Sequence, residues 1–226
     1  MSGAELGILL LSLKVGLVSL VASLPVAIAV AFVLARKEFP GKTLFDAVVH
    51  LPLVLPPVVV GFALLVLFGT QGPIGSLLEP LGIVFAFRWT GAALAAAIMG
   101  FPLLVRAVRL SIESVDPRLE LAARTLGASR TRVFFTVTLP LAASGVATGA
   151  LLAFARALGE FGATITFVSN IPGETRTLPT AIYTYTQVPG GDFQAAQLAA
   201  VAVILSLLAL LVSEFLSRRM SARIGG

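Results

Sequence analysis

The chain has 226 residues, of which 58% are hydrophobic and 12% are charged. A soluble domain carries about 25% charged residues, so this sequence has too few to cover a water-facing surface. A lipid bilayer is the expected solvent, and the net charge of +5 is interpreted as a topology signal rather than a nucleic-acid-binding surface. Cysteine is absent and His50 is the single histidine, which excludes disulfides and argues against a metal centre.

Several apolar stretches are long enough to cross a bilayer, which takes about 20 mostly apolar residues for each helix. They are roughly Ile8–Ala35, Leu44–Phe68, Thr90–Ile112, Leu141–Phe161 and Ala195–Leu216. The fourth stretch can continue to Val168, and Leu178–Gln187 leaves a sixth crossing open. No lysine or arginine precedes Lys14, so the first stretch is expected to be retained rather than cleaved as a signal. We expect one all-α membrane domain over residues 1–226.

Positive charge alternates between the connecting segments. Basic residues follow the first, third and fifth stretches: Arg36, Lys37 and Lys42; Arg106, Arg109, Arg118, Arg124, Arg130 and Arg132; and Arg218, Arg219 and Arg223. The segments Thr70–Trp89 and Ser169–Gln194 each hold a single arginine. Since basic loops stay in the cytoplasm, the N-terminus is expected outside and the C-terminus inside.

Prolines interrupt three of the apolar stretches: Pro25 in the first, Pro52, Pro56 and Pro57 in the second, and Pro102 in the third. A proline inside a membrane helix is tolerated where neighbouring groups satisfy the freed carbonyl. These kinks are either a consequence of packing or a way for helices to line a path and move.

A stripe of small residues recurs every four positions in the fourth stretch. Gly145, Gly149 and Ala153 are followed by Ala157 on the same helix face. Small residues let two helix backbones approach closely in lipid, so these are predicted helix-packing positions. The partner helix belongs either to the same chain or to a second copy, and both alternatives stay open.

The segment of residues 113–140 is too polar to cross a membrane, yet its pattern is helical. Asp116 and Pro117 are a typical N-cap and first residue of a helix, and Gly127 separates two helical pieces. An amphipathic, basic helix pair between two crossings is expected to dock a cytoplasmic partner. The alternative is a membrane-surface helix held by anionic lipids.

This segment resembles the signature loop of permease subunits of ABC-type importers, which reads Glu-Ala-Ala, three residues, Gly, nine residues, Ile, any residue, Leu-Pro. The sequence departs from the signature at Leu121, which stands at the glutamate position, and Glu120 lies one residue earlier. By this resemblance, the residues that couple the chain to an ATPase are Glu120, Leu121, Ala122, Ala123, Gly127, Ala128, Ser129, Val137, Leu139 and Pro140.

Three further segments resemble the molybdate and sulfate branch of these permeases. They are Leu51–Gly61, Phe154–Thr164 and Phe167–Thr177, the last most similar to molybdate permeases. The resemblance implies the ABC type I importer permease fold and transport of molybdate into the cytoplasm by alternating access. Tungstate and sulfate, which are also tetrahedral dianions, remain alternative substrates.

The resemblance also implies partners and a location. Two copies of the chain would form the pore, and two cytoplasmic ATPase subunits would bind the loop 117–139. A periplasmic or extracellular oxyanion-binding protein would deliver the substrate, and lipid would surround the assembly. ATP and Mg²⁺ would be used by the ATPase, so no cofactor is expected on this chain. The location implied is the plasma membrane of a prokaryote, or the inner membrane if the cell is Gram-negative.

A few charged side chains fall within or beside the apolar stretches. Arg156 and Glu160 are four residues apart and share a helix face, so they form either a structural ion pair or part of the anion path or its gate. Lys14 is expected to reach the membrane interface with its long stem. Arg106 and Arg109 are expected to anchor topology, with contact of Arg106 with the inner pathway as an alternative, and His50 is expected to serve packing or an interface.

Rival function classes find little support. Gly41-Lys42-Thr43 suggests a phosphate loop, but Arg36 stands at the first glycine position and no strand precedes it. An intramembrane hydrolase needs a Ser–His pair or paired acids within a crossing, and none is evident. We therefore expect no catalytic residue. A plain channel would have no use for a docking loop.

Overall fold

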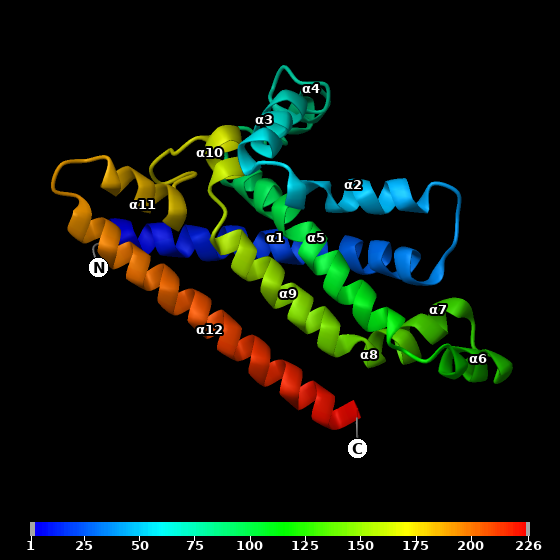
Figure 1. The fold of residues 1–226 in the computed structure, drawn as a ribbon. Helices are drawn as coiled ribbons and strands as arrows, with labels where there is room; N and C mark the ends of the chain where they lie inside the picture. The colour runs from blue at the N-terminus through cyan, green and yellow to red at the C-terminus, as the bar shows by residue number, and fades with distance from the viewer. Residues whose placement is uncertain (1–2, 225–226) are drawn as a thin grey trace.

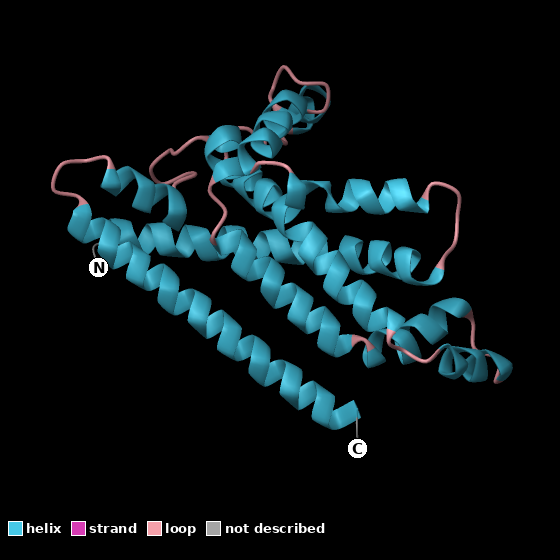
Figure 2. Ribbon diagram, in the orientation of Figure 1, coloured by secondary structure: helices cyan, strands magenta, loops and turns pink. Residues whose placement is uncertain are grey.

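The computed structural model describes the backbone of residues 3–224 and, beyond residue 209, the side chains of residues 211, 212 and 215 alone. The predicted topology signals Arg218, Arg219 and Arg223 lie outside the described side chains. The described residues are helical with short connections and hold no strand (Figure 2). The elements in chain order are α1 (Gly3–Arg36), α2 (Lys42–Val54), α3 (Pro57–Phe68), α4 (Gly75–Leu78), the 3₁₀ turn η1 (Glu79–Leu81), α5 (Trp89–Glu113), α6 (Pro117–Thr125), α7 (Arg130–Val133), the π-helical turn η2 (Phe134–Thr138), α8 (Leu139–Leu141), α9 (Ala143–Leu158), α10 (Gly162–Val168), α11 (Leu178–Thr186) and α12 (Asp192–Ile224).

Three helices among the described residues are long and apolar enough to cross a membrane: α1, α5 and the part of α12 over Asp192–Ala209. Two bent pairs qualify when each pair is taken together, namely α2 with α3 and Arg130–Leu141 with α9, which gives up to five crossings. The helix α11 has nine residues, so it is about 14 Å long and too short for a sixth crossing.

The second apolar stretch, predicted as one crossing, is broken into α2 and α3, whose axes meet at 113°. Pro56 and Pro57 cause the break, because each lacks an amide hydrogen and each forces the residue before it out of the helical region. Leu55 accordingly has φ −70° and ψ 141°, and Pro56 has φ −55° and ψ 133°. The sequence analysis identified these prolines as interruptions of the apolar stretch, but a sequence does not give the angle between the two helices.

The fourth apolar stretch also differs from the prediction. The helix α9 ends at Leu158, and residues 159–161 lead into the separate helix α10, so the helix does not continue to Val168. At its other end α9 meets the preceding segment at 70°. The short segment at 178–187, whose helical character was left open, forms α11.

The helices α1, α5 and α9 pack side by side as the core of the molecule, with α12 along α9 (Figure 1). Small side chains permit the close approach: Ala92, Ala93, Ala95 and Ala96 of α5 are buried. The C-terminal end of α1, the α1–α2 turn and α6–α8 lie at the same end of the molecule (Figure 1). The basic segment between the first and second predicted crossings and the one between the third and fourth therefore lie at the same end of the molecule.

Candidate functional site

The polar segment between α5 and α9 contains the predicted helix pair. Asp116 caps α6 by accepting the amide hydrogen of Arg118 at 2.9 Å, and Pro117 is its first residue. Ser129 caps α7 by accepting the amide hydrogen of Arg132 at 3.3 Å. Local side-chain chemistry thus starts each of these two helices.

Gly127 terminates α6 in a left-handed conformation, with φ +87°. The amide of Ala128 donates to the carbonyl oxygen of Ala123 at 3.1 Å, and the amide of Gly127 donates to the carbonyl oxygen of Arg124 at 3.0 Å. These two bonds form a Schellman motif, which glycine fits best because it lacks a Cβ. The signature glycine is therefore the residue that turns the chain from α6 to α7.

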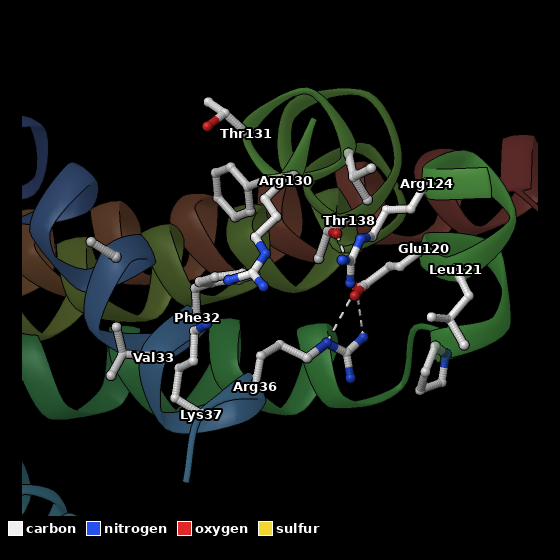
Figure 3. Close-up of a pocket in the computed structure, with 14 residues that line it drawn as sticks. Phe32, Val33, Arg36, Lys37, Glu120, Leu121, Arg124, Arg130, Thr131 and Thr138 are labelled. Carbon is white, nitrogen blue, oxygen red and sulfur yellow. Dashed lines mark hydrogen bonds and ion pairs between the residues drawn. The ribbon is translucent and has the colours of Figure 1, made fainter. Parts of the chain in front are cut away.

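Glu120 lies at the centre of a polar network at the base of this helix pair (Figure 3). Its Oε1 accepts from Arg36 Nη2 at 2.9 Å, from Arg36 Nε at 3.2 Å and from Thr138 Oγ1 at 3.0 Å. Arg36 Nη2 also donates to the carbonyl of Val115 at 2.9 Å. The network joins α6 to the end of α1 and to η2, which leads into α9.

The outer face of the helix pair carries exposed leucines. Leu121, at the signature's glutamate position, is 57% exposed, and Leu126 next to the turn is 88% exposed. Large apolar side chains held in the open beside polar neighbours are typical of a protein-binding surface. The signature's acidic position thus presents an apolar side chain outward, while Glu120 is engaged within the chain.

The remaining predicted coupling residues divide between surface and interior. Ala122 is exposed, Ala123 and Ala128 are half-buried, and Val137 is half-buried in η2. Leu139 and Pro140 form the short helix α8, one turn before the bend at Ala142. The two ends of the signature therefore lie at the docking face and at the entrance to α9.

A cavity of about 670 Å³ lies between the last turns of α1 and the segment α6–η2 (Figure 3). Its lining combines apolar residues with four basic side chains and one acidic side chain. The lining residues are Ala29, Phe32, Val33, Arg36, Lys37, Pro117, Glu120, Leu121, Arg124, Arg130, Thr131, Val133, Phe134 and Thr138. The rings of Phe32 and Phe134 meet edge to face, with centroids 4.9 Å apart.

Arg156 and Glu160 form an ion pair, with Arg156 Nη1 2.6 Å from Glu160 Oε2. The Glu160 side chain is 1% exposed, and its Oε1 accepts the amide hydrogen of Ala163 at 2.8 Å. Oε2 has no hydrogen bond of suitable angle, so distance and charge define its contact with Arg156. The carboxylate therefore connects the end of α9 to the first turn of α10, as a structural ion pair would.

The small-residue stripe of α9 packs against α5 of the same chain. A methyl group added at Gly149 would lie 2.9 Å from Ala107 Cβ, and one at Gly145 would overlap the side chain of Ser111. Ala153 meets Gly100, where an added methyl would lie 3.2 Å from the Ala153 carbonyl oxygen. The stripe thus packs against a helix of the same chain, which is one of the two alternatives that the sequence left open, the other being a helix of a second copy.

One polar cluster was missed by sequence reasoning. Asp46 Oδ2 lies 2.9 Å from Arg109 Nη1, and Arg109 Nε lies 2.8 Å from Glu113 Oε1. His50 Nδ1 lies 2.9 Å from the Asp46 carbonyl oxygen and 3.0 Å from its Oδ1. The cluster connects α2 to α5, and the sequence does not reveal it because Asp46 and Arg109 are 63 positions apart.

Two other basic residues, Arg106 and Lys14, lie within the long apolar helices α5 and α1. Arg106 is exposed on α5, one turn before Arg109. Lys14 of α1 places Nζ 3.5 Å from the ring centroid of Trp89, the first residue of α5. The Lys14 ammonium thus has an aromatic partner in the chain, in addition to any contact with the membrane interface.

Comparison with known proteins gives consistent matches. The family model for the binding-protein-dependent transport system inner membrane component matches residues 23–222. The molybdenum transport system permease protein ModB of Escherichia coli K12 is 60% identical over 217 residues, which cover 96% of this chain and 95% of the relative. The ModB of Haemophilus influenzae is 57% identical over 222 residues, 98% of this chain and 97% of the relative. The sulfate transport system permease protein CysW of Synechococcus elongatus is 41% identical over 169 residues, 75% of this chain and 59% of the relative.

Solved structures of ABC transporters share the fold. A bacterial alginate ABC transporter has a TM-score of 0.77 at 18% identity, with 97% of this chain and 80% of that chain covered. The MetNI methionine ABC transporter, in inward-facing conformations, has a TM-score of 0.68 at 16% identity, with 97% and 99% covered. The architecture described above is therefore shared with chains of these two ABC transporters.

Proposed function

Because the chain belongs to the family of binding-protein-dependent transport system inner membrane components, we propose that it is the permease subunit of an ATP-driven molybdate importer. The molybdenum relatives support this substrate, since they match nearly the whole chain at higher identity than the sulfate relative. Tungstate and sulfate share the tetrahedral dianionic form, so direct competition decides among them. The permease itself is a non-catalytic membrane subunit.

The observation that carries the coupling role is the network around Glu120. A cytoplasmic ATPase bound to the exposed Leu121 and Leu126 would move α6. Because Glu120 is tied to Arg36 and Thr138, displacement of α6 would pull on α1 and on the approach to α9. Both helices belong to the packed core, so the movement would reach the membrane interior. Alternating access then follows from a change in how these helices pack.

The assembly proposed has two copies of this chain, two ATPase subunits and an oxyanion-binding protein on the opposite side of the membrane. ATP and Mg²⁺ belong to the ATPase. Exposed apolar side chains on α2 and α3, including Val54 at 82% and Phe62 at 60%, are available to the second copy or to lipid. The end that holds α6–α8 faces the cytoplasm, with the N-terminus outside, in the plasma membrane of a prokaryote.

The pair Arg156–Glu160 also belongs to the proposed substrate path or its gate. Arg156 is 29% exposed, whereas Glu160 is buried beneath it. A dianion would be attracted by the arginine, and the adjacent carboxylate would prevent tight trapping. A transport path needs favourable entry and easy release, which such a neutralised pair provides.

The test is transport by the reconstituted assembly. The chain is co-expressed with the ATPase and purified, then placed in vesicles with the binding protein outside and ATP inside. ATP-dependent uptake of labelled molybdate, competed by tungstate more strongly than by sulfate, is the expected result. Uptake that proceeds without ATP would indicate a channel. Hydrolytic activity of the lone chain, with no ATPase co-purifying, would indicate an enzyme.

A further inference from the structure

We propose that the cavity between α1 and α6–η2 binds the headgroup of an anionic phospholipid from the adjoining membrane leaflet. The proposal rests on the membrane placement within the proposed function, and it concerns the side of the helix pair that faces α1, where the cavity shares Leu121 with the docking face.

The cavity wall changes from apolar to charged along α1. Ala29, Phe32 and Val33 line one end, and Arg36 and Lys37 line the other. From Ala29 to Arg36 the helix rises about 10 Å, which is the distance from a lipid headgroup into the upper acyl chains. On the opposite wall, apolar residues of α7 and η2 also line the apolar end of the cavity. An amphiphile fits this gradient, whereas a fully hydrated ion would meet apolar surface at one end.

The charged end of the cavity is strongly positive. Arg36 is balanced by Glu120, but Lys37, Arg124 and Arg130 have no ion-pair partner among the residues that the structure describes. Figure 3 shows the side chains of Arg36, Arg124 and Arg130 directed from α1, α6 and α7 towards the same space. Lys37, Arg124 and Arg130 are exposed, so water screens their repulsion in part, but three unbalanced positive charges around one cavity still favour an anion there.

A phosphodiester satisfies this arrangement. Guanidinium groups bind phosphate through paired hydrogen bonds, and basic pockets at the ends of membrane helices are typical headgroup sites. A cytoplasmic protein can reach the exposed leucines at the tip of the helix pair. It would have to enter the bilayer to cover Phe32 and Ala29, which lie one and two turns before Arg36. The lipid is therefore the occupant that fits both ends of the cavity.

The experiment compares two double variants of the assembled complex. In the first, Arg124→Gln and Arg130→Gln remove two basic side chains that line the cavity. In the matched control, Arg118→Gln and Arg132→Gln remove the same charge from the same loop, at exposed positions outside the cavity. Each complex is titrated in neutral phosphatidylcholine nanodiscs with phosphatidylglycerol, and bound phosphatidylglycerol is counted by native mass spectrometry. The thermal melt of each purified complex, compared with that of the unsubstituted complex, verifies that the loop is folded.

The cavity variant is expected to weaken phosphatidylglycerol binding by about 30-fold, from about 1 kcal/mol for each basic residue near the surface. The control is expected to change it by less than about threefold. Equal loss in both variants, or no loss in either, would overturn the site. Displacement of the lipid by millimolar inorganic phosphate or molybdate would instead identify a free-anion site and would also overturn the proposal. ATP-driven uptake without lipid retention would sink this inference alone, whereas lipid retention without uptake would sink the proposed function alone.

Discussion

Arg36 and Glu120 lie 84 positions apart in the chain and meet at 2.9 Å, where the last turn of α1 touches α6. Their side chains are 16% and 20% exposed, so water screens the pair only in part. The acidic residue stands one position before the signature's glutamate, and this shift rotates it by about 100° around the helix. The rotation turns the carboxylate away from the docking face and towards the chain's own arginine.

A double-mutant cycle tests this connection. Glu120→Gln and Arg36→Gln should each lower ATP-driven uptake and thermal stability, and the double variant should lose less than the sum. We expect a coupling free energy of about 1.5 kcal/mol, between that of a surface pair and a buried one. The measurement is the free energy of unfolding of the purified complex for all four proteins. Glu38→Gln is the control, since Glu38 pairs with Lys42 but is 88% exposed. If the losses of stability from Glu120→Gln and Arg36→Gln simply add in the double variant, the two residues are not energetically coupled and the prediction is wrong.

Gly127 gives a prediction about backbone conformation alone. An added Cβ would meet nothing within 4 Å, so the cost of a side chain comes from φ +87°. Gly127→Val should cost about 1–2 kcal/mol and weaken ATPase binding about tenfold, whereas Gly127→Asn should remain close to wild type because asparagine tolerates this region. The readouts are the dissociation constant of the ATPase and the uptake rate. If valine and asparagine behave alike, the left-handed turn is not what the docking loop requires.

Gly149 gives a prediction about packing. Gly149→Leu forces α9 away from Ala107 and Leu104 of α5, and overpacking of this kind costs about 1–3 kcal/mol. The melting temperature of the complex should fall by about 5 °C. Gly7→Leu is the control, because an added Cβ at Gly7 meets nothing within 4 Å. Loss of the second copy from an otherwise stable chain would instead assign the stripe to the contact between copies.

Glu160 gives a prediction that separates stability from transport. Glu160→Ala removes both the Arg156 ion pair and the acceptor for the Ala163 amide, and should cost about 3–5 kcal/mol, as breaking a buried pair does. Glu160→Gln keeps an acceptor and should lose less. The measurements are folded yield and the uptake rate for each molecule of folded complex. A variant that folds normally yet transports slowly would assign the pair to the substrate path rather than to the α9–α10 connection.

The sequence predicted local features well where one physical rule decides them. The apolar stretch at 90–112 became α5 with bounds that differ by one residue at each end, because hydropathy and length determine a crossing helix. Asp116, Pro117 and Gly127 were assigned as start and stop residues, and each serves in that way. These signals act within a single turn of the chain.

The features that sequence reasoning missed depend on register between distant helices. Neither Asp46 with Arg109 nor Arg36 with Glu120 is visible in the sequence, because each pair requires the relative rotation of two helices. Hydropathy reports that a helix is buried in lipid or protein but gives no angle around its axis. The cavity beside Arg36 was unpredictable for the same reason, since residues of α1, α6, α7 and η2 line it together.

The two bends in the chain have different mechanical properties. The 113° angle at Leu55 and Pro56 is built into the covalent structure, since two successive prolines prohibit a continuous helix at that point. The 70° angle at Ala142 involves φ −84° and ψ 1°, so a rotation of about 40° in ψ would bring this residue to helical values. The two prolines therefore fix the angle between α2 and α3, whereas no such constraint fixes the angle between the docking loop and α9. If the helices change their angles during a transport cycle, we expect the change at Ala142 rather than at Pro56.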